Sequence, residues 1–357
     1  MVLIILNIKV MNAKILGIVF ILVISSVIIA RWDVLINNKK IISNSCVTEA
    51  RSSVTFIMGT DEPNSNNFYK NATYYYHMHP KDKTDVVTHS CKTLKDILDY
   101  LSTNSENISF GTINIVCHGN PWQGLSMSIT HDSPRASLPN LKAALKSKKI
   151  SHLCNNSVDH HTQINFISCG VGQNKELNEI LKEIFSCPES HRTPIFNIEK
   201  NYVNFISKMD KTQAEFYFVA SKYDYSDPNI ISGKLKNKYK NIPINWQKAY
   251  RNENRHLSDE PYKHRFKMLV EWTIGFNDSN EIPKLKNDID ILQWLKTQRT
   301  AIAELNQMQL KPEDFMWHSF LVSNQSNTIK IKGYGNVEGV MIDLQADDIS
   351  KKLALLH

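Results

Sequence analysis

The chain has 357 residues, of which 42% are hydrophobic and 22% charged, and its formal net charge at pH 7 is +7. This composition excludes an intrinsically disordered chain, and the length is sufficient for one large or two ordinary hydrophobic cores. The six cysteines are too few and too widely scattered to act as a disulfide scaffold for a chain of this length.

The N-terminal part contains an apolar run at residues 15–30 that no charged residue interrupts. A run of this length is slightly short of the ~20 residues that span a bilayer as a helix, but it suits a signal peptide or a short anchor. We therefore interpret residues 1–36 as a signal peptide or a transmembrane anchor with its flank. The chain is then membrane-anchored or exported, to the periplasm or the medium, and its frequent Lys, Asn and Ile residues are typical of an AT-rich bacterial genome.

Residues 50–232 alternate between short apolar runs and amphipathic segments. The apolar runs predict buried strands at 54–59, 113–117, 164–168, 194–196 and 214–220. Apolar residues at helical spacing predict helices at 93–101, 138–145 and 176–185. The stretch 61–83, rich in Asn, Pro and Tyr, predicts a long loop with a ragged strand at 73–77. This alternation favours an α/β fold with a mostly parallel sheet covered on both faces.

Residues 233–357 have a different pattern, which we interpret as a smaller C-terminal α+β accessory region. A basic stretch at 234–255 predicts a solvated loop or helix face, and 284–309 predicts a helix. Two strands are expected at 328–332 and 337–344, joined by a glycine-containing hairpin turn at 333–336.

Two of the predicted strands stop at a reactive side chain that is followed at once by glycine. The first ends in His118-Gly119 and the second in Cys169-Gly170, with 51 positions between the His and the Cys. In a doubly wound sheet this length of chain returns the next parallel strand alongside, so both strand ends meet at one edge. Open α/β sheets place their sites at this edge.

This pair of residue types points to nucleophilic catalysis by a thiol. A thiol attacks a carbonyl as the thiolate, so it needs a nearby imidazole and donors for the oxyanion that forms. His118 is the candidate base and Cys169 the candidate nucleophile, and we expect the pKa of Cys169 to be lowered. The backbone N–H groups of Gly119 and Cys169 are the expected oxyanion donors, and Gly119 and Gly170 allow close passage of a peptide.

The two motifs resemble those of the caspase-like cysteine peptidases, the superfamily that includes metacaspases, gingipains, legumain, separase and the bacterial CHAT-domain proteases. The residues that carry this resemblance are Val116-Cys117-His118-Gly119 and Phe166-Ile167-Ser168-Cys169-Gly170. The resemblance covers roughly residues 54–223 and implies a caspase-like three-layer sandwich and peptidase activity. The chain lacks the Gln-Ala-Cys-Arg-Gly sequence that surrounds the caspase nucleophile, which favours a bacterial CHAT-type or metacaspase-type relative.

We therefore predict a hydrolase, a cysteine endopeptidase that cleaves protein or peptide substrates through a His118–Cys169 dyad and an acyl-enzyme. Asn120 and Trp122, in the loop after the His, are further candidates for substrate contact. The residue preference at the cleavage site stays open. The alternative is a catalytically silent caspase-like scaffold that binds a protein partner at the membrane.

No cofactor or metal is expected, because the His and Cys spacings match no paired ligand template. Nucleic acid is not an expected partner of a membrane-directed chain, despite aromatic residues near the basic stretch. Among the cysteines, Cys117 lies inside an apolar strand and is expected to be an inert buried thiol. Export would permit a disulfide among four others, with the pairing left open: Cys46, Cys91, Cys154 and Cys187.

Overall fold

A computed structural model of the chain divides into two compact units, Met1–Arg51 and Ser52–His357. The residues that the structure describes are 51–61, 67–78, 85–105, 109–154, 156–187, 193–223, 227–253, 260–323 and 327–344. The predicted signal or anchor at 1–36 lies outside them. Within these ranges no helix is long and apolar enough to cross a bilayer.

The first part of the Ser52–His357 unit is built on a parallel five-stranded sheet, here called sheet A. Its strand order is β2-β1-β3-β6-β7, and every neighbouring pair runs parallel. The strands are β1 (Val54–Ile57), β2 (Asp85–Val87), β3 (Thr112–Val116), β6 (Gln163–Ile167) and β7 (Ile195–Ile198). The prediction of a mixed α/β fold with a mostly parallel sheet is confirmed.

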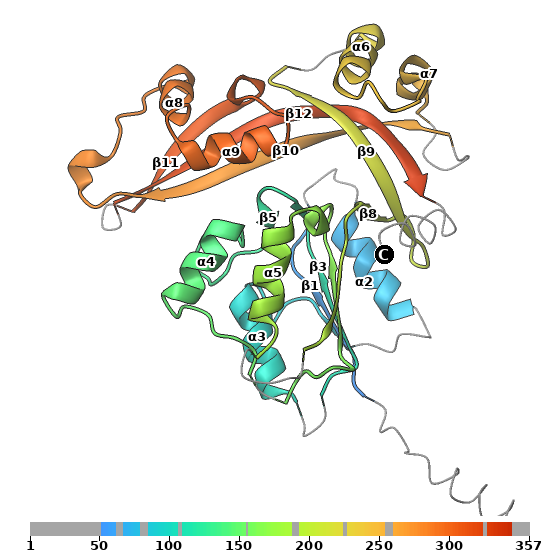
Figure 1. Cartoon of the computed structure of the whole chain (residues 1–357), viewed down its shortest axis with the longest axis vertical. Helices are drawn as coiled ribbons and strands as arrows, with labels where there is room; N and C mark the ends of the chain where they lie inside the picture. The colour runs from blue at the N-terminus through green and yellow to red at the C-terminus, as the bar shows by residue number, and fades with distance from the viewer. Residues whose placement is uncertain are drawn as a thin grey trace, which may run out of the picture. The chain divides into compact units, whose positions relative to one another are not determined.

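Helices cover both faces of sheet A because its strands are apolar on both faces (Figure 1). One face packs against α3 (Leu94–Thr103), α4 (Leu138–Lys146) and α5 (Lys175–Ile184), close to the three predicted helices. The other face packs against α2 (Phe68–Met78). Thr93 caps α3 and exchanges hydrogen bonds with Asp96 in a capping box, which explains why the helix begins there.

Helix α2 corrects the prediction of a loop with a ragged strand at 73–77. Four residues at helical spacing are buried on one side of this helix: Phe68, Tyr69, Ala72 and Tyr76. The carboxylate of Asp61 accepts hydrogen bonds from the backbone N–H groups of Tyr69 (3.0 Å) and Lys70 (2.9 Å) at the start of the helix. These bonds satisfy donors that a helix start leaves unpaired, so a distant acidic residue supplies the cap.

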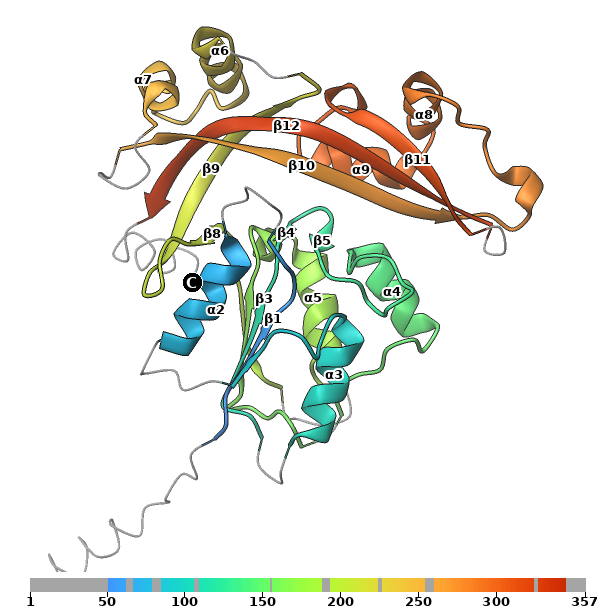
Figure 2. The same ribbon diagram turned by 180° about the vertical axis from the view of Figure 1, so that it is seen from behind.

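A second sheet, here called sheet D, is antiparallel, with strand order β10-β12-β9-β8 and with β11 also paired to β12 (Figure 2). Its strands are β8 (Tyr202–Phe205), β9 (Lys211–Ser221), β10 (Tyr262–Gly275), β11 (Met316–Ser323) and β12 (Thr328–Leu344). Sheet D therefore takes strands from both sides of residue 232. The strand predicted at 214–220 belongs to this antiparallel sheet, whereas the alternation of strands and helices had placed it in the parallel one.

Strand β12 corrects the predicted hairpin at 328–344. It runs as one strand through Gly333-Tyr334-Gly335-Asn336, with Gly333 paired to Val270 on one side and Trp317 on the other. A Cβ atom on Gly333 would overlap the Trp317 ring. The glycine therefore serves close packing of an indole, and the strand continues through it.

Two pairs of helices pack against sheet D. The basic stretch forms α6 (Pro228–Lys238) and α7 (Trp246–Arg251), which bury Leu235, Trp246 and Tyr250 and leave their lysines at the surface, except Lys238. The helix predicted at 284–309 is instead two helices, α8 (Asp288–Leu295) and α9 (Arg299–Gln307). Each has its own apolar side against the sheet, and the chain turns between them.

Candidate functional site

The candidate dyad lies at the carboxyl ends of two neighbouring strands. Val116 at the end of β3 pairs with Ile167 at the end of β6, and His118 and Cys169 each follow two residues later. Val116 and Ile167 belong to the apolar cluster beneath α2, and Cys169 packs against the same cluster. Since alternate residues of a strand share a face, His118 and Cys169 are both directed to the α2 side of sheet A.

The imidazole of His118 is packed between two aromatic rings of α2. It stacks on Phe68 with ring centroids 4.6 Å apart and meets the edge of Tyr69 at 4.8 Å. The backbone N–H of His118 donates to the Tyr69 hydroxyl at 3.1 Å, and its C=O accepts from Ser126 N–H at 2.8 Å. The residue as a whole is exposed, but the rings shield part of the imidazole from water and lower its pKa.

The thiol of Cys169 is held by the backbone of β8. The thiol donates to the C=O of Val203 at 3.5 Å, and its sulfur accepts from the N–H of Val203 at the same distance. Removal from water raises the pKa of Cys169 to about 11, and the charge of Glu199 acts in the same direction. The expectation of a lowered pKa was therefore wrong, because desolvation outweighs the hydrogen bonds that favour the thiolate.

The two groups thus have the protonation states of a neutral pair at pH 7. The thiol keeps its proton, and the imidazole is an unprotonated base. Within the described contacts no hydrogen bond joins His118 to Cys169. The arrangement can support removal of the thiol proton by the imidazole during attack, whereas a stable imidazolium–thiolate pair is disfavoured.

Two glycines bring two loops side by side: the His loop, residues 117–125 after β3, and the Cys loop, residues 168–174 after β6. Gly119 lies in a short ribbon of β4 (Gly119–Asn120) and β5 (Gly124–Leu125), and its Cα passes against the Ser168 hydroxyl. Gly170 has φ +67°, a left-handed conformation that favours glycine, and faces Pro121. The N–H of Gly170 donates to Asn201 C=O at 3.0 Å, which leaves the N–H groups of Gly119 and Cys169 as the oxyanion candidates.

Asn120 and Trp122, the other two predicted substrate contacts, both have structural partners. The Asn120 side chain accepts from Gln123 N–H at 2.6 Å, which fixes the turn between β4 and β5. Trp122 packs against the apolar cluster of sheet D, with its ring 6.4 Å from that of Phe218. Its indole N–H is buried, and none of the described residues accepts a hydrogen bond from it.

Sequence reasoning missed the residues of α2 that surround the candidate base. Phe68 and Tyr69 contact the imidazole, and the carboxylate of Asp61 favours its protonated form electrostatically. The spacing of Phe68, Ala72 and Tyr76 was a helical signal in the sequence. The surrounding Asn and Pro residues concealed it, because they are typical of loops.

The remaining described cysteines have structural positions. Cys154 and Cys187 form a disulfide with their Cα atoms 4.5 Å apart, which settles a pairing that the sequence left open. Cys117 is fully buried, as predicted, and burial raises the pKa of its thiol to about 12. Cys91 is also a buried free thiol. Among the free cysteines that the structure describes, Cys169 is the one whose residue is only partly buried, although its thiol is removed from water.

We compared the chain with protein-family models, curated proteins and solved structures, and none of them matches it.

Proposed function

We propose that this protein is a cysteine endopeptidase of caspase-like type in which His118 and Cys169 form the catalytic dyad. The observation that carries this proposal is the shared register of β3 and β6, which brings an imidazole and a free thiol to adjacent strand ends on one face. The resemblance of the two motifs to those of caspase-like peptidases supports the same reaction.

In the proposed mechanism His118 takes the Cys169 proton as the sulfur attacks the scissile carbonyl. The backbone N–H groups of Gly119 and Cys169 donate to the oxyanion. Protonated His118 then gives its proton to the leaving amine as the C–N bond breaks, which leaves a thioester. Water, deprotonated by His118, attacks this thioester, and the acyl product leaves as the carboxylic acid while the thiol is regenerated.

The proposed location is outside the cytoplasm, with the domain exported or held at the membrane by residues 1–36. The Cys154–Cys187 disulfide supports this location, because structural disulfides persist in oxidising compartments. Protein or peptide substrates would meet the enzyme there. No cofactor enters the proposed mechanism.

A second candidate function is that of a silent scaffold that binds a protein partner. Two observations favour it: the raised pKa of Cys169, and the apolar side chains on one face of β11, where Met316 and Phe320 are 45% and 51% exposed. Exposed apolar side chains on a strand at the side of a sheet are typical of interaction surfaces.

The test between the two is labelling of the full-length chain with a library of peptidyl electrophiles that differ in the residue before the warhead. Mass spectrometry then identifies the modified thiol. The peptidase proposal predicts selective modification of Cys169 and a rate loss of roughly 10²- to 10⁴-fold in His118→Ala, the usual contribution of a general base. The best peptide identifies the residue preference.

The matched control is His131→Ala, which removes an exposed imidazole outside the candidate site and should leave the rate unchanged. The peptidase proposal fails if no peptide labels Cys169 faster than a simple alkylating agent of the same warhead chemistry. The scaffold proposal then stands.

A further inference from the structure

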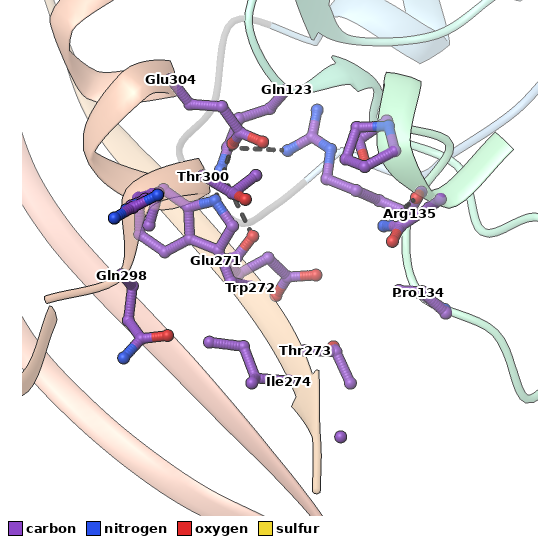
Figure 3. Close-up of a pocket in the computed structure, with 16 residues that line it drawn as sticks. Gln123, Pro134, Arg135, Glu271, Trp272, Thr273, Ile274, Gln298, Thr300 and Glu304 are labelled. Carbon is purple, nitrogen blue, oxygen red and sulfur yellow. Dashed lines mark hydrogen bonds between the residues drawn. The ribbon is translucent and has the colours of Figure 1, made fainter. Parts of the chain in front are cut away.

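A polar cavity of about 330 Å³ lies between the loop that follows His118 and the strands and helices of the C-terminal part (Figure 3). It is separate from the candidate dyad, since neither His118 nor Cys169 lines it. Its wall on one side comes from Gln123 and Arg135, and on the other from β10 and α9 with Glu271, Trp272 and Glu304. Its volume is in the range of small-molecule sites.

Arg135 presents a fixed positive charge to this cavity. Its guanidinium donates to three acceptors of one loop, namely the carbonyls of Gly124 (3.1 Å) and Leu125 (3.2 Å) and the Gln123 side chain (3.2 Å). A guanidinium has five N–H groups, so two remain. No carboxylate of the described residues forms an ion pair with Arg135, and Glu271 and Glu304 act on it only from a longer distance.

Glu304 presents a carboxyl group to the same cavity. The residue is 8% exposed, and one carboxylate oxygen accepts from the indole N–H of Trp272 at 2.6 Å. No described residue forms an ion pair with it, and burial raises the pKa of Glu304 to about 7. A second carboxylate, that of Glu271, lies 3.4 Å from Lys330. Figure 3 shows Glu304 and Arg135 directed toward the same space beside Gln123.

A guanidinium and a carboxyl group that share a cavity without an ion pair between them suit a ligand that carries both signs, because a bound ammonium group favours the ionised form of Glu304. We propose that this cavity binds a small zwitterion, a free α-amino acid, with its carboxylate on Arg135 and its ammonium group beside Glu304 and the Trp272 ring. Charge-assisted hydrogen bonds to a guanidinium and a cation over an indole are favourable contacts of this kind. A ligand with a single charge would interact favourably with only one of these two groups, Arg135 or Glu304.

The residues that line the cavity are bonded to the His loop. Arg135 holds the carbonyls of Gly124 and Leu125, and β5 pairs with Gly119 directly after His118. Gln123 donates to the Glu271 carbonyl at 3.3 Å and so joins the same loop to β10. An amino acid in the cavity would add contacts between these two parts of the chain.

Isothermal titration calorimetry of the full-length protein tests the proposal, with L-glutamine, L-alanine and L-leucine as ligands up to about 10 mM. Each amino acid is compared with its carboxamide, which lacks the carboxylate, and with its N-acetyl derivative, which lacks the ammonium group. At least one free amino acid should bind, and both of its capped forms should bind about tenfold more weakly or worse.

Glu304→Gln keeps an acceptor for Trp272 and removes the charge, so its affinity for the amino acid should fall about tenfold. Glu179→Gln, an exposed position of α5, is the matched control and should bind as the unmodified chain does. The proposal is overturned if no free amino acid binds, if either capped form binds equally well, or if Glu304→Gln binds unchanged. The measurement needs no peptidase activity, so its failure is distinct from failure of the dyad.

Discussion

At the scale of single residues, the environment of Cys169 decides which chemistry the candidate dyad can perform. The backbone C=O and N–H of Val203 in β8 form hydrogen bonds with the thiol. The aromatic rings of α2 shield part of the imidazole from water. Removal from water disfavours the charged form of both groups, and for the thiol it outweighs the hydrogen bond from Val203 that favours the thiolate, so the resting pair is neutral.

The pH dependence of alkylation reports this neutral pair directly. Because the pKa of Cys169 is about 11, the thiolate fraction should rise about tenfold per pH unit from pH 7 to 10, without a plateau. The second-order rate constant of iodoacetamide with Cys169 should follow the same rise. A small thiol of ordinary pKa is the control and levels off above about pH 9. A plateau for Cys169 near pH 7 would instead reveal a preformed imidazolium–thiolate pair.

At the scale of elements, the main errors of the sequence interpretation came from residues that have two structural uses. Asn and Pro around α2 concealed a helix whose start is capped by Asp61. Glycines at 333 and 335 indicated a turn, but in β12 they make room for the rings of Trp317 and Phe315. Local composition cannot distinguish a turn glycine from a packing glycine, because the difference lies in a partner from another strand.

Substitution of Gly333 tests this packing role. Gly333→Ala should lower the free energy of unfolding by about 1–3 kcal/mol, because the added methyl group overlaps the Trp317 ring in a central strand. Urea denaturation followed by tryptophan fluorescence measures the change. If residues 333–336 were instead an exposed turn, the same change would be close to neutral.

Gly233→Ala is the matched control for that measurement. Gly233 lies in α6, and a Cβ atom there would have no neighbour within 4 Å. Alanine should raise the free energy of unfolding by about 0.5–1 kcal/mol, since it reduces the freedom of the unfolded chain and favours a helix.

At the scale of the whole molecule, the two sheets are connected through the segments that build the candidate site. The His loop contacts sheet D through Gln123 and Trp122, and the Cys loop is bonded to Asn201, just before β8. The Cys154–Cys187 disulfide closes a loop that contains β6, Cys169 and α5. The disulfide therefore restrains the segment that carries the candidate nucleophile.

Removal of the Cys154–Cys187 disulfide should destabilise the folded protein. A covalent loop of this length restricts the unfolded chain, so Cys154→Ser with Cys187→Ser should lower the free energy of unfolding by about 2–4 kcal/mol. Urea denaturation with and without dithiothreitol measures it. Reductant should destabilise the unmodified chain and leave the double variant unaffected. Equal stability of the two chains under oxidising conditions would contradict a structural role for the bond.

Although β2 and α2 were not predicted, the amino-acid sequence is enough to predict most strands of the parallel sheet, the helices α3 to α5 and the two reactive strand ends. These features are local: apolar periodicity marks β1, β3, β6 and α3 to α5, and a His-Gly and a Cys-Gly dipeptide end two buried strands. Chain reversal through a right-handed crossover then brings parallel strand ends to one edge. The candidate pair could therefore be identified before any contact was known.

Four features follow from long-range contacts instead: the protonation state of that pair, the role of Trp122, the disulfide partner and the sheet to which β9 belongs. Each of these depends on groups far away in the chain: Val203 for Cys169, Phe218 for Trp122, Cys187 for Cys154 and β12 for β9. Desolvation and strand pairing are properties of the assembled neighbours, so no window of the sequence contains them.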